Sequence, residues 1–170
     1  MAHQRQQIRE AVVALLKAAS ITTEVHETRT PPVRRLRLPT LNVASLEESV
    51  DEASASSAPR ELRRELDLAV EIYVEATATS AADDLMDTLA ERVEIAMSAD
   101  ETLGGKASDS ILTSTEIEIH DTGDKLIGCA RLTFTVTYFT YPADLVLPDL
   151  QTAHVEHGVL ASDLITGLDT

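Results

Sequence analysis

Apolar and polar side chains alternate along residues 61–77, and this stretch constrains the fold more than any other part of the chain. Because successive side chains of a strand point to opposite faces, the pattern predicts one long strand. A sheet built on it needs a covering layer on one side only. The apolar face carries Leu66, Leu68, Val70, Ile72 and Val74, and the largely acidic face carries Asp67, Ala69, Glu71, Tyr73 and Glu75.

Two segments with helical spacing can supply that covering layer. The first is residues 3–19, and the second is expected to begin with Ala81 after a capping Ser80. Asp83 and Asp84 in its first turn would suit the positive end of the helix dipole. This helix is expected to end near Ser98, with Gly104 and Gly105 in the C-terminal stop that follows. The two apolar stripes are Ile8, Val12, Leu15, Leu16 and Ala19, and Leu85, Leu89, Val93 and Ala96.

Shorter strands complete the sheet. One is expected within residues 21–27, and another begins near residue 41. Residues 47–59, rich in Glu, Ser and Ala, are expected to form a flexible excursion. Alternating patterns at 111–120 and 125–141 flank turn-forming residues, which predicts a hairpin.

Helix, three strands, helix and hairpin in this order predict an α+β fold. We expect a mostly antiparallel sheet of four to five strands with two main helices packed on it. A chain of 170 residues is long enough for one core, which we place in a domain over residues 1–141. The apolar period stops at Pro142, so residues 142–170 are expected to form an extended C-terminal arm.

The formal net charge of −15 is unevenly distributed. Residues 1–64 carry 10 basic and 8 acidic side chains, whereas residues 65–170 carry 4 basic and 21 acidic ones. Phosphate neutralisation needs clustered Lys and Arg, so a free nucleic-acid binder is disfavoured. A chain with one mildly basic and one strongly acidic half can associate head to tail with its own copies. The alternative is a solvated acidic surface that favours solubility.

No motif points to chemistry. The single cysteine, Cys129, excludes an internal disulfide and a cysteine-rich zinc site, and we expect it to pack in the interior. His154 and His157 share an H-x-x-H spacing but lack further ligands nearby. The pairs Glu47–Glu48 and Asp83–Asp84 lie where acids have structural reasons to be, and Gly104–Gly105 lacks the phosphate-loop pattern. We therefore expect no catalytic residue, no cofactor and no metal.

A cluster of arginines around a proline pair is the one surface feature that suggests a function. Arginine makes bidentate pairs with carboxylates, which this chain has in excess, so the cluster is a candidate subunit interface. An ordinary basic loop is the alternative, and a phosphate-binding patch is less favoured beside 29 acids. The candidates are Arg29, Arg34, Arg35 and Arg37, joined by Arg60, Arg63 and Arg64.

The order and texture of these segments resemble the tail-terminator family of lambda-type phages. The resemblance covers about residues 5–141. It includes I-R-E-A-V-V-A-L-L-K-A at 8–18, L-P-T-L-N-V at 38–43, E-L-D-L-A-V-E-I-Y-V at 65–74, D-D-L-M-D-T-L-A-E-R-V-E at 83–94 and A-R-L-T-F-T-V-T-Y at 130–138. The chain departs from the family in its low-complexity segment 47–59 and in the arm 142–170.

The resemblance implies a structural virion protein without enzymatic activity or cofactor. Members form a homohexameric ring on the end of the tail tube, which stops tube polymerisation and offers a surface to the head-completion or connector protein. DNA would pass through the lumen without specific binding. The sequence has no apolar run long enough to span a bilayer and no signal-peptide pattern, so we expect assembly in the host cytoplasm and residence in the virion.

Three alternatives remain at this stage. The chain could be a related phage neck or head-completion subunit, which would also form a ring. It could be an enzyme whose polar residues converge only in the folded chain. It could also be a non-viral, regulatory binding protein.

Overall fold

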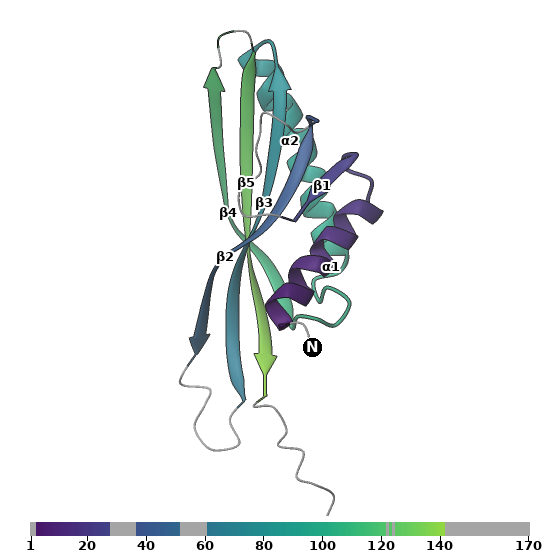
Figure 1. The fold of residues 1–170 in the computed structure, drawn as a ribbon, viewed down its shortest axis with the longest axis vertical. Helices are drawn as coiled ribbons and strands as arrows, with labels where there is room; N and C mark the ends of the chain where they lie inside the picture. Colours follow the sequence, from purple (N-terminus) through teal and green to yellow (C-terminus); the bar gives the residue numbers. More distant parts are fainter. Residues whose placement is uncertain (1–2, 28–36, 52–60, 122, 124, 142–170) are drawn as a thin grey trace, which may run out of the picture.

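The computed structural model describes residues 3–27, 37–51, 61–121, 123 and 125–141. Two helices lie on the same side of a single twisted sheet (Figure 1). The predicted α+β fold, with a mostly antiparallel sheet and two main helices, is confirmed. The elements are α1 (Gln4–Ala18), β1 (Glu24–His26), β2 (Thr40–Asp51), β3 (Leu62–Ala76), α2 (Thr79–Ala99), β4 (Asp109–Asp121) and β5 (Leu126–Thr140).

The sheet has the strand order β1-β2-β3-β5-β4. Strand β3, which corresponds to the long strand predicted over residues 61–77, therefore lies at its centre. The pairs β2–β3, β3–β5 and β4–β5 are antiparallel. The short β1 pairs with β2 in parallel, with Val25 opposite Leu41. This edge pair is the one parallel pair among the described strands, in agreement with the mostly antiparallel sheet that the sequence predicted.

The core lies between the helices and the apolar face of the sheet. Helix α2 packs on β3 and β5, and α1 packs on β1, β2 and α2. All five alternating apolar residues of β3 are fully buried, as the sequence pattern predicted. Their main partners in the core are Ile8, Val12 and Leu16 of α1, Leu41 and Val43 of β2, Met86, Leu89 and Val93 of α2, and Leu132, Phe134 and Val136 of β5.

Strand β2 is longer than the sequence predicted. Residues 47–51, expected to belong to a flexible excursion, pair with β3 as far as Asp51 opposite Arg63. A bulge between Ser45 and Glu47 shifts the register, so Glu48 lies opposite Leu66 on the helix side of the sheet. The carboxylate there accepts hydrogen bonds from neighbouring side chains, which explains why an acidic segment remains in the strand. Residues 52–59 lie outside the described part.

The predicted start of the second helix was wrong in detail. Helix α2 begins at Thr79 with Ala78 as its N-cap, so Ser80 lies within the helix and its first turn contains no acidic residue. The helix ends at Ala99, close to the predicted Ser98, and its C-cap is Asp100 and not the glycine pair. The carboxylate of Asp100 instead accepts hydrogen bonds from Thr102 Oγ1 at 2.8 Å and from the Gly104 amide at 2.7 Å.

Strand β4 does not alternate uniformly. A bulge between Leu112 and Ser114 changes which residues face the helices. Before the bulge Ser110 is buried on the helix side and Ile111 is exposed, whereas beyond it Thr115 pairs with Leu132. Thr113 lies at the bulge.

Close packing between α2 and the sheet depends on Gly128 of β5. A Cβ atom at this position would lie 2.8 Å from Met86 Sδ and 2.8 Å from Val74 Cγ2. The methionine is flexible, but the β-branched Val74 is buried and has little freedom to move. Glycine therefore allows the helix to approach the strand at this point.

We expect Gly128→Ala to lower the free energy of unfolding by about 1–3 kcal/mol, because the added methyl overpacks the contact. Urea denaturation would measure the change. Thr133→Ala, on the opposite face of the same strand, is the control and should cost less than about 0.5 kcal/mol. Equal effects of the two substitutions would contradict the packing role of Gly128.

Candidate assembly interface

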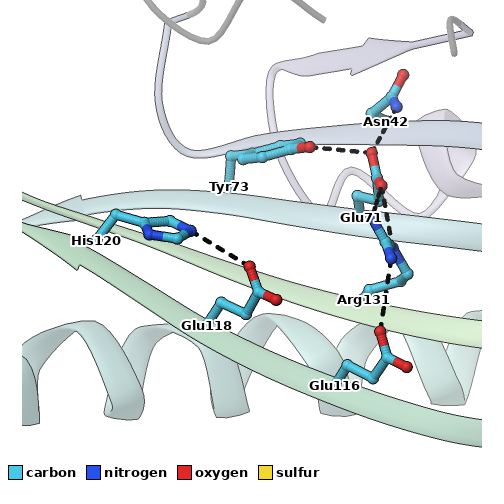
Figure 2. Close-up of polar contacts among 7 residues, drawn as sticks. All are labelled: Asn42, Glu71, Tyr73, Glu116, Glu118, His120 and Arg131. Atoms are coloured by element: carbon cyan, nitrogen blue, oxygen red, sulfur yellow. Dashed lines mark hydrogen bonds and ion pairs between the residues drawn. The ribbon is translucent and has the colours of Figure 1, made fainter. Parts of the chain in front are cut away.

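A row of polar side chains crosses the face of the sheet that the helices leave uncovered. Asn42, Glu71, Arg131 and Glu116 are successive partners across β2, β3, β5 and β4. Figure 2 shows Glu71 at the centre of the row, where its carboxylate accepts from Asn42 Nδ2 at 2.9 Å and from Tyr73 OH at 3.0 Å. The Arg131 guanidinium donates to Glu71 Oε1 through Nε at 3.1 Å and Nη2 at 2.9 Å.

Glu71 is only 6% exposed, so its charge depends on these partners. A buried carboxylate is stable when it is paired and its lone pairs accept hydrogen bonds. Arg131 also lies 3.5 Å from Glu116 of β4, which extends the row to the sheet edge. Glu71, at the centre of the acidic face, therefore forms its contacts within its own chain.

Other carboxylates on this side of β3 are also engaged. Asp67 accepts from Thr135 Oγ1 at 3.0 Å, and Glu75 pairs with Lys125 Nζ at 2.5 Å. These contacts join β3 to β5 and to the residue just before β5.

Cys129 lies on this polar face and is half-buried, not packed in the apolar core as expected. Its strand partner is Tyr73, which also donates to Glu71. Burial, and then the nearby Glu71 charge, raise the pKa of the Cys129 thiol. Since the thiolate is the reactive form, this cysteine is a poor nucleophile.

A second polar cluster closes the end of the core on the helix side. Glu48 of β2 pairs with Arg64 Nη1 of β3 at 3.1 Å and with Arg5 Nη1 of α1 at 3.2 Å. The buried Tyr138 hydroxyl of β5 donates to the same carboxylate. Figure 1 shows β2, β3 and β5 continuing beyond the helices, and this cluster lies where α1 begins. The sequence did not reveal it, because Glu48 was assigned to a loop.

The arginine candidates fall into different environments. Arg37 is exposed just before β2. Arg63 pairs with Glu65 at 2.7 Å, while Arg64 pairs with Glu48 and donates to Thr140 Oγ1 at 2.9 Å. The structure therefore gives Arg64 a role within the chain. Arg29, Arg34, Arg35 and Arg60 lie outside the described residues, as do the arm 142–170 and its two histidines.

Helix α2 presents carboxylates of a different kind. Glu91 and Glu94 of the helix and Glu101 just after it are exposed, and within the described ranges none of them forms an ion pair. The one arginine of the helix, Arg92, is turned away from them and donates to the carbonyls of Ser20 at 2.9 Å and Ile21 at 3.1 Å. Acidic groups open to a partner are thus on the helix rather than on β3.

No group of three or more His, Cys, Asp or Glu side chains is arranged to hold a metal ion in the described part of the chain. None of its helices is long and apolar enough to cross a bilayer.

Comparisons with known proteins give a distant likeness only. No protein-family model and no curated protein matches the chain. Among solved structures, the chain is similar to one in a structure described as "Virion of native gene transfer agent (GTA) particle". The two are 14% identical, the match covers 81% of this chain and 92% of that one, and the TM-score is 0.37. A likeness at this level transfers neither a function nor a partner.

Arg131→Met should destabilise the fold, because it leaves the buried Glu71 charge without its ion-pair partner. We expect a loss of about 2 kcal/mol, less than for a fully buried pair because Arg131 is partly exposed. Urea denaturation of both single variants and of Arg131→Met with Glu71→Gln completes a double-mutant cycle. Additive losses, with no coupling between the two positions, would refute the interaction.

Stability should also fall at high pH. Burial is the main cause that raises the pKa of Tyr73 and of Tyr138, followed by their contacts with Glu71 and Glu48. Because the folded-state values lie above the ordinary value of about 10, this contribution is complete below about pH 10 and is lost as pH rises toward the folded values. Urea denaturation between pH 8 and 11 should show a steeper decline for the wild type than for Tyr73→Phe/Tyr138→Phe. Parallel declines would contradict this assignment.

Proposed function

We propose that this chain is a structural virion protein, a phage tail terminator whose copies form a homohexameric ring on the end of the tail tube. The ring stops further polymerisation of the tail-tube protein and offers the surface to which a head-completion or connector protein binds. The protein is assembled in the host cytoplasm and remains in the virion.

The observation that carries this proposal is the order of elements within residues 5–141. The five segments that resemble the tail-terminator family fall in α1, at the start of β2, in β3, in α2 and in β5. These elements pack around one core. The segments that resemble the family therefore coincide with successive helices and strands of one domain, and they share more than a pattern of apolar and polar residues.

Charge supports a ring of identical subunits. Four arginines and no acid occur within residues 29–37, whereas α2 exposes carboxylates that have no cationic partner in the described ranges. Complementary surfaces at different places on one chain make a heterologous contact, which closes into a ring when the rotation permits. Within the ring, an acidic lumen repels DNA phosphates and lets the DNA pass without binding.

Tube polymerisation tests the function directly. Purified chain would be added to the polymerising tail-tube protein encoded by the same genome, and electron micrographs would give the tube lengths. We expect shorter tubes with one added ring of density at one end, and a free chain that sediments as a hexamer or assembles only on the tube. Unchanged tubes, with the chain bound to DNA-filled heads instead, would favour the head-completion alternative.

A further inference from the structure

A groove of about 460 Å³ runs between the C-terminal half of α2 and the first residues of β4. Its floor is apolar, with Met97 of α2, Leu112 of β4 and Phe134 of β5. Ile95 lies on the rim and is 62% exposed. Exposed isoleucine beside an open apolar floor is typical of a contact surface rather than of a finished core edge.

The rim of this groove is acidic. Glu91, Glu94 and Glu101 line it, and no basic side chain of the described residues does so. Glu91, Glu94 and Ile95 follow helical spacing, so they share the face of α2 that looks toward β4. Like charges gathered this way repel one another, and a cationic partner would relieve that repulsion.

A buried polar atom in the same groove is also without a partner. Ser110 of β4 lines the groove and is 7% exposed, and its hydroxyl makes no hydrogen bond among the described residues. An unsatisfied buried hydroxyl costs about 1–3 kcal/mol, and a bound segment with a polar group could supply the missing partner. The groove thus combines an apolar floor, an acidic rim and an open hydrogen-bonding position.

Residues 29–37 of this chain match that chemistry. They carry Arg29, Arg34, Arg35 and Arg37 without any acidic residue, and the apolar Val33 and Leu36 lie next to arginines. Guanidinium groups pair bidentately with carboxylates, while the apolar side chains suit the floor. A segment of this composition fits the groove better than an acidic or purely apolar one.

The position of the segment in the fold favours binding between copies. Residues 28–36 connect β1 to β2 at one edge of the sheet, whereas the groove lies beside β4 at the other edge. Three strand spacings separate β2 from β4, about 14 Å. Both helices cover the face between them (Figure 1). A path around the helix layer is longer than this separation, whereas nine residues that leave and return span at most about 15 Å, and this favours the groove of a second copy as the binding site.

We propose that the groove between α2 and β4 binds residues 29–37 of a second copy of this chain, and that this contact is the repeating interface of the ring. The inference rests on the proposed ring and identifies the acidic surface of its subunit interface.

Charge reversal tests the contact. Glu91→Lys/Glu94→Lys should weaken self-association at least about tenfold in sedimentation velocity, because it places cations against arginines. The matched control is Asp84→Lys/Asp87→Lys, which makes the same charge change on exposed residues of the same helix outside the groove, and should change association less than about threefold. Circular dichroism would verify that each variant is folded.

Restoring association by exchanging the charges on both sides of the contact is a more specific test than charge reversal on one side. Arg34→Glu/Arg35→Glu should also weaken association, and a chain carrying both the Glu→Lys and the Arg→Glu pairs should recover it, because every interface then has exchanged charges. If the arginine variant dissociates but the glutamate variant does not, the ring stands and the groove assignment is overturned. Full association of both double variants would overturn the charge-paired ring as well.

Disulfide trapping distinguishes binding between copies from binding within one chain. In a Cys129→Ala background, chains with Ile95→Cys and chains with Leu36→Cys would be mixed and oxidised. The inference predicts a disulfide dimer that contains one chain of each kind, detected by mass spectrometry. The inference would be overturned if a chain with both cysteines closed only on itself. It would also be overturned if the wild-type chain stayed monomeric and the mixed cysteine variants gave no dimer. Capping of tail tubes by such a monomer would leave the tail-terminator function in place.

Discussion

Burial of the apolar face of β3 is the constraint on which the rest of the structure depends. Five alternating side chains of this central strand are fully buried, and leaving them in water would cost on the order of 10 kcal/mol. Helix α2 supplies most of the cover because it packs on both β3 and β5, and Gly128 permits that approach. The strand order follows from the same requirement, since the strand with the most buried residues occupies the centre and the three-residue β1 an edge.

The opposite face of β3 is stabilised differently. No helix of the described chain covers it, yet Glu71 is almost fully buried there among Asn42, Tyr73 and Arg131. These partners come from β2, β3 itself and β5, so the carboxylate is satisfied in one register only. A slip of one residue would turn Glu71 into the apolar core, which makes the pairing a determinant of register as well as of stability.

The acidic residues therefore form two groups, which the net charge of −15 does not distinguish. Carboxylates on the strands pair across the sheet, with Glu71 and Glu48 at the centres of two clusters. Those on the groove side of α2 have no such partner in the described ranges. In the ring that we propose, these carboxylates would be neutralised by the basic segment of the neighbouring copy.

The sequence by itself determined the fold class, the central strand, both helices and the closing hairpin, because periodicity is a local property of the chain. It missed the continuation of β2 to Asp51 and the bulge in β4, since both depend on pairing with strands that lie far away in the sequence. It also missed the N-cap Ala78, which makes no side-chain hydrogen bond that a sequence pattern could reveal. The pattern identified the acidic face of β3 but not its internal pairing. Which carboxylates remain open to a partner was decided only by the tertiary structure, because ion pairs across strands join residues that lie far apart in the sequence.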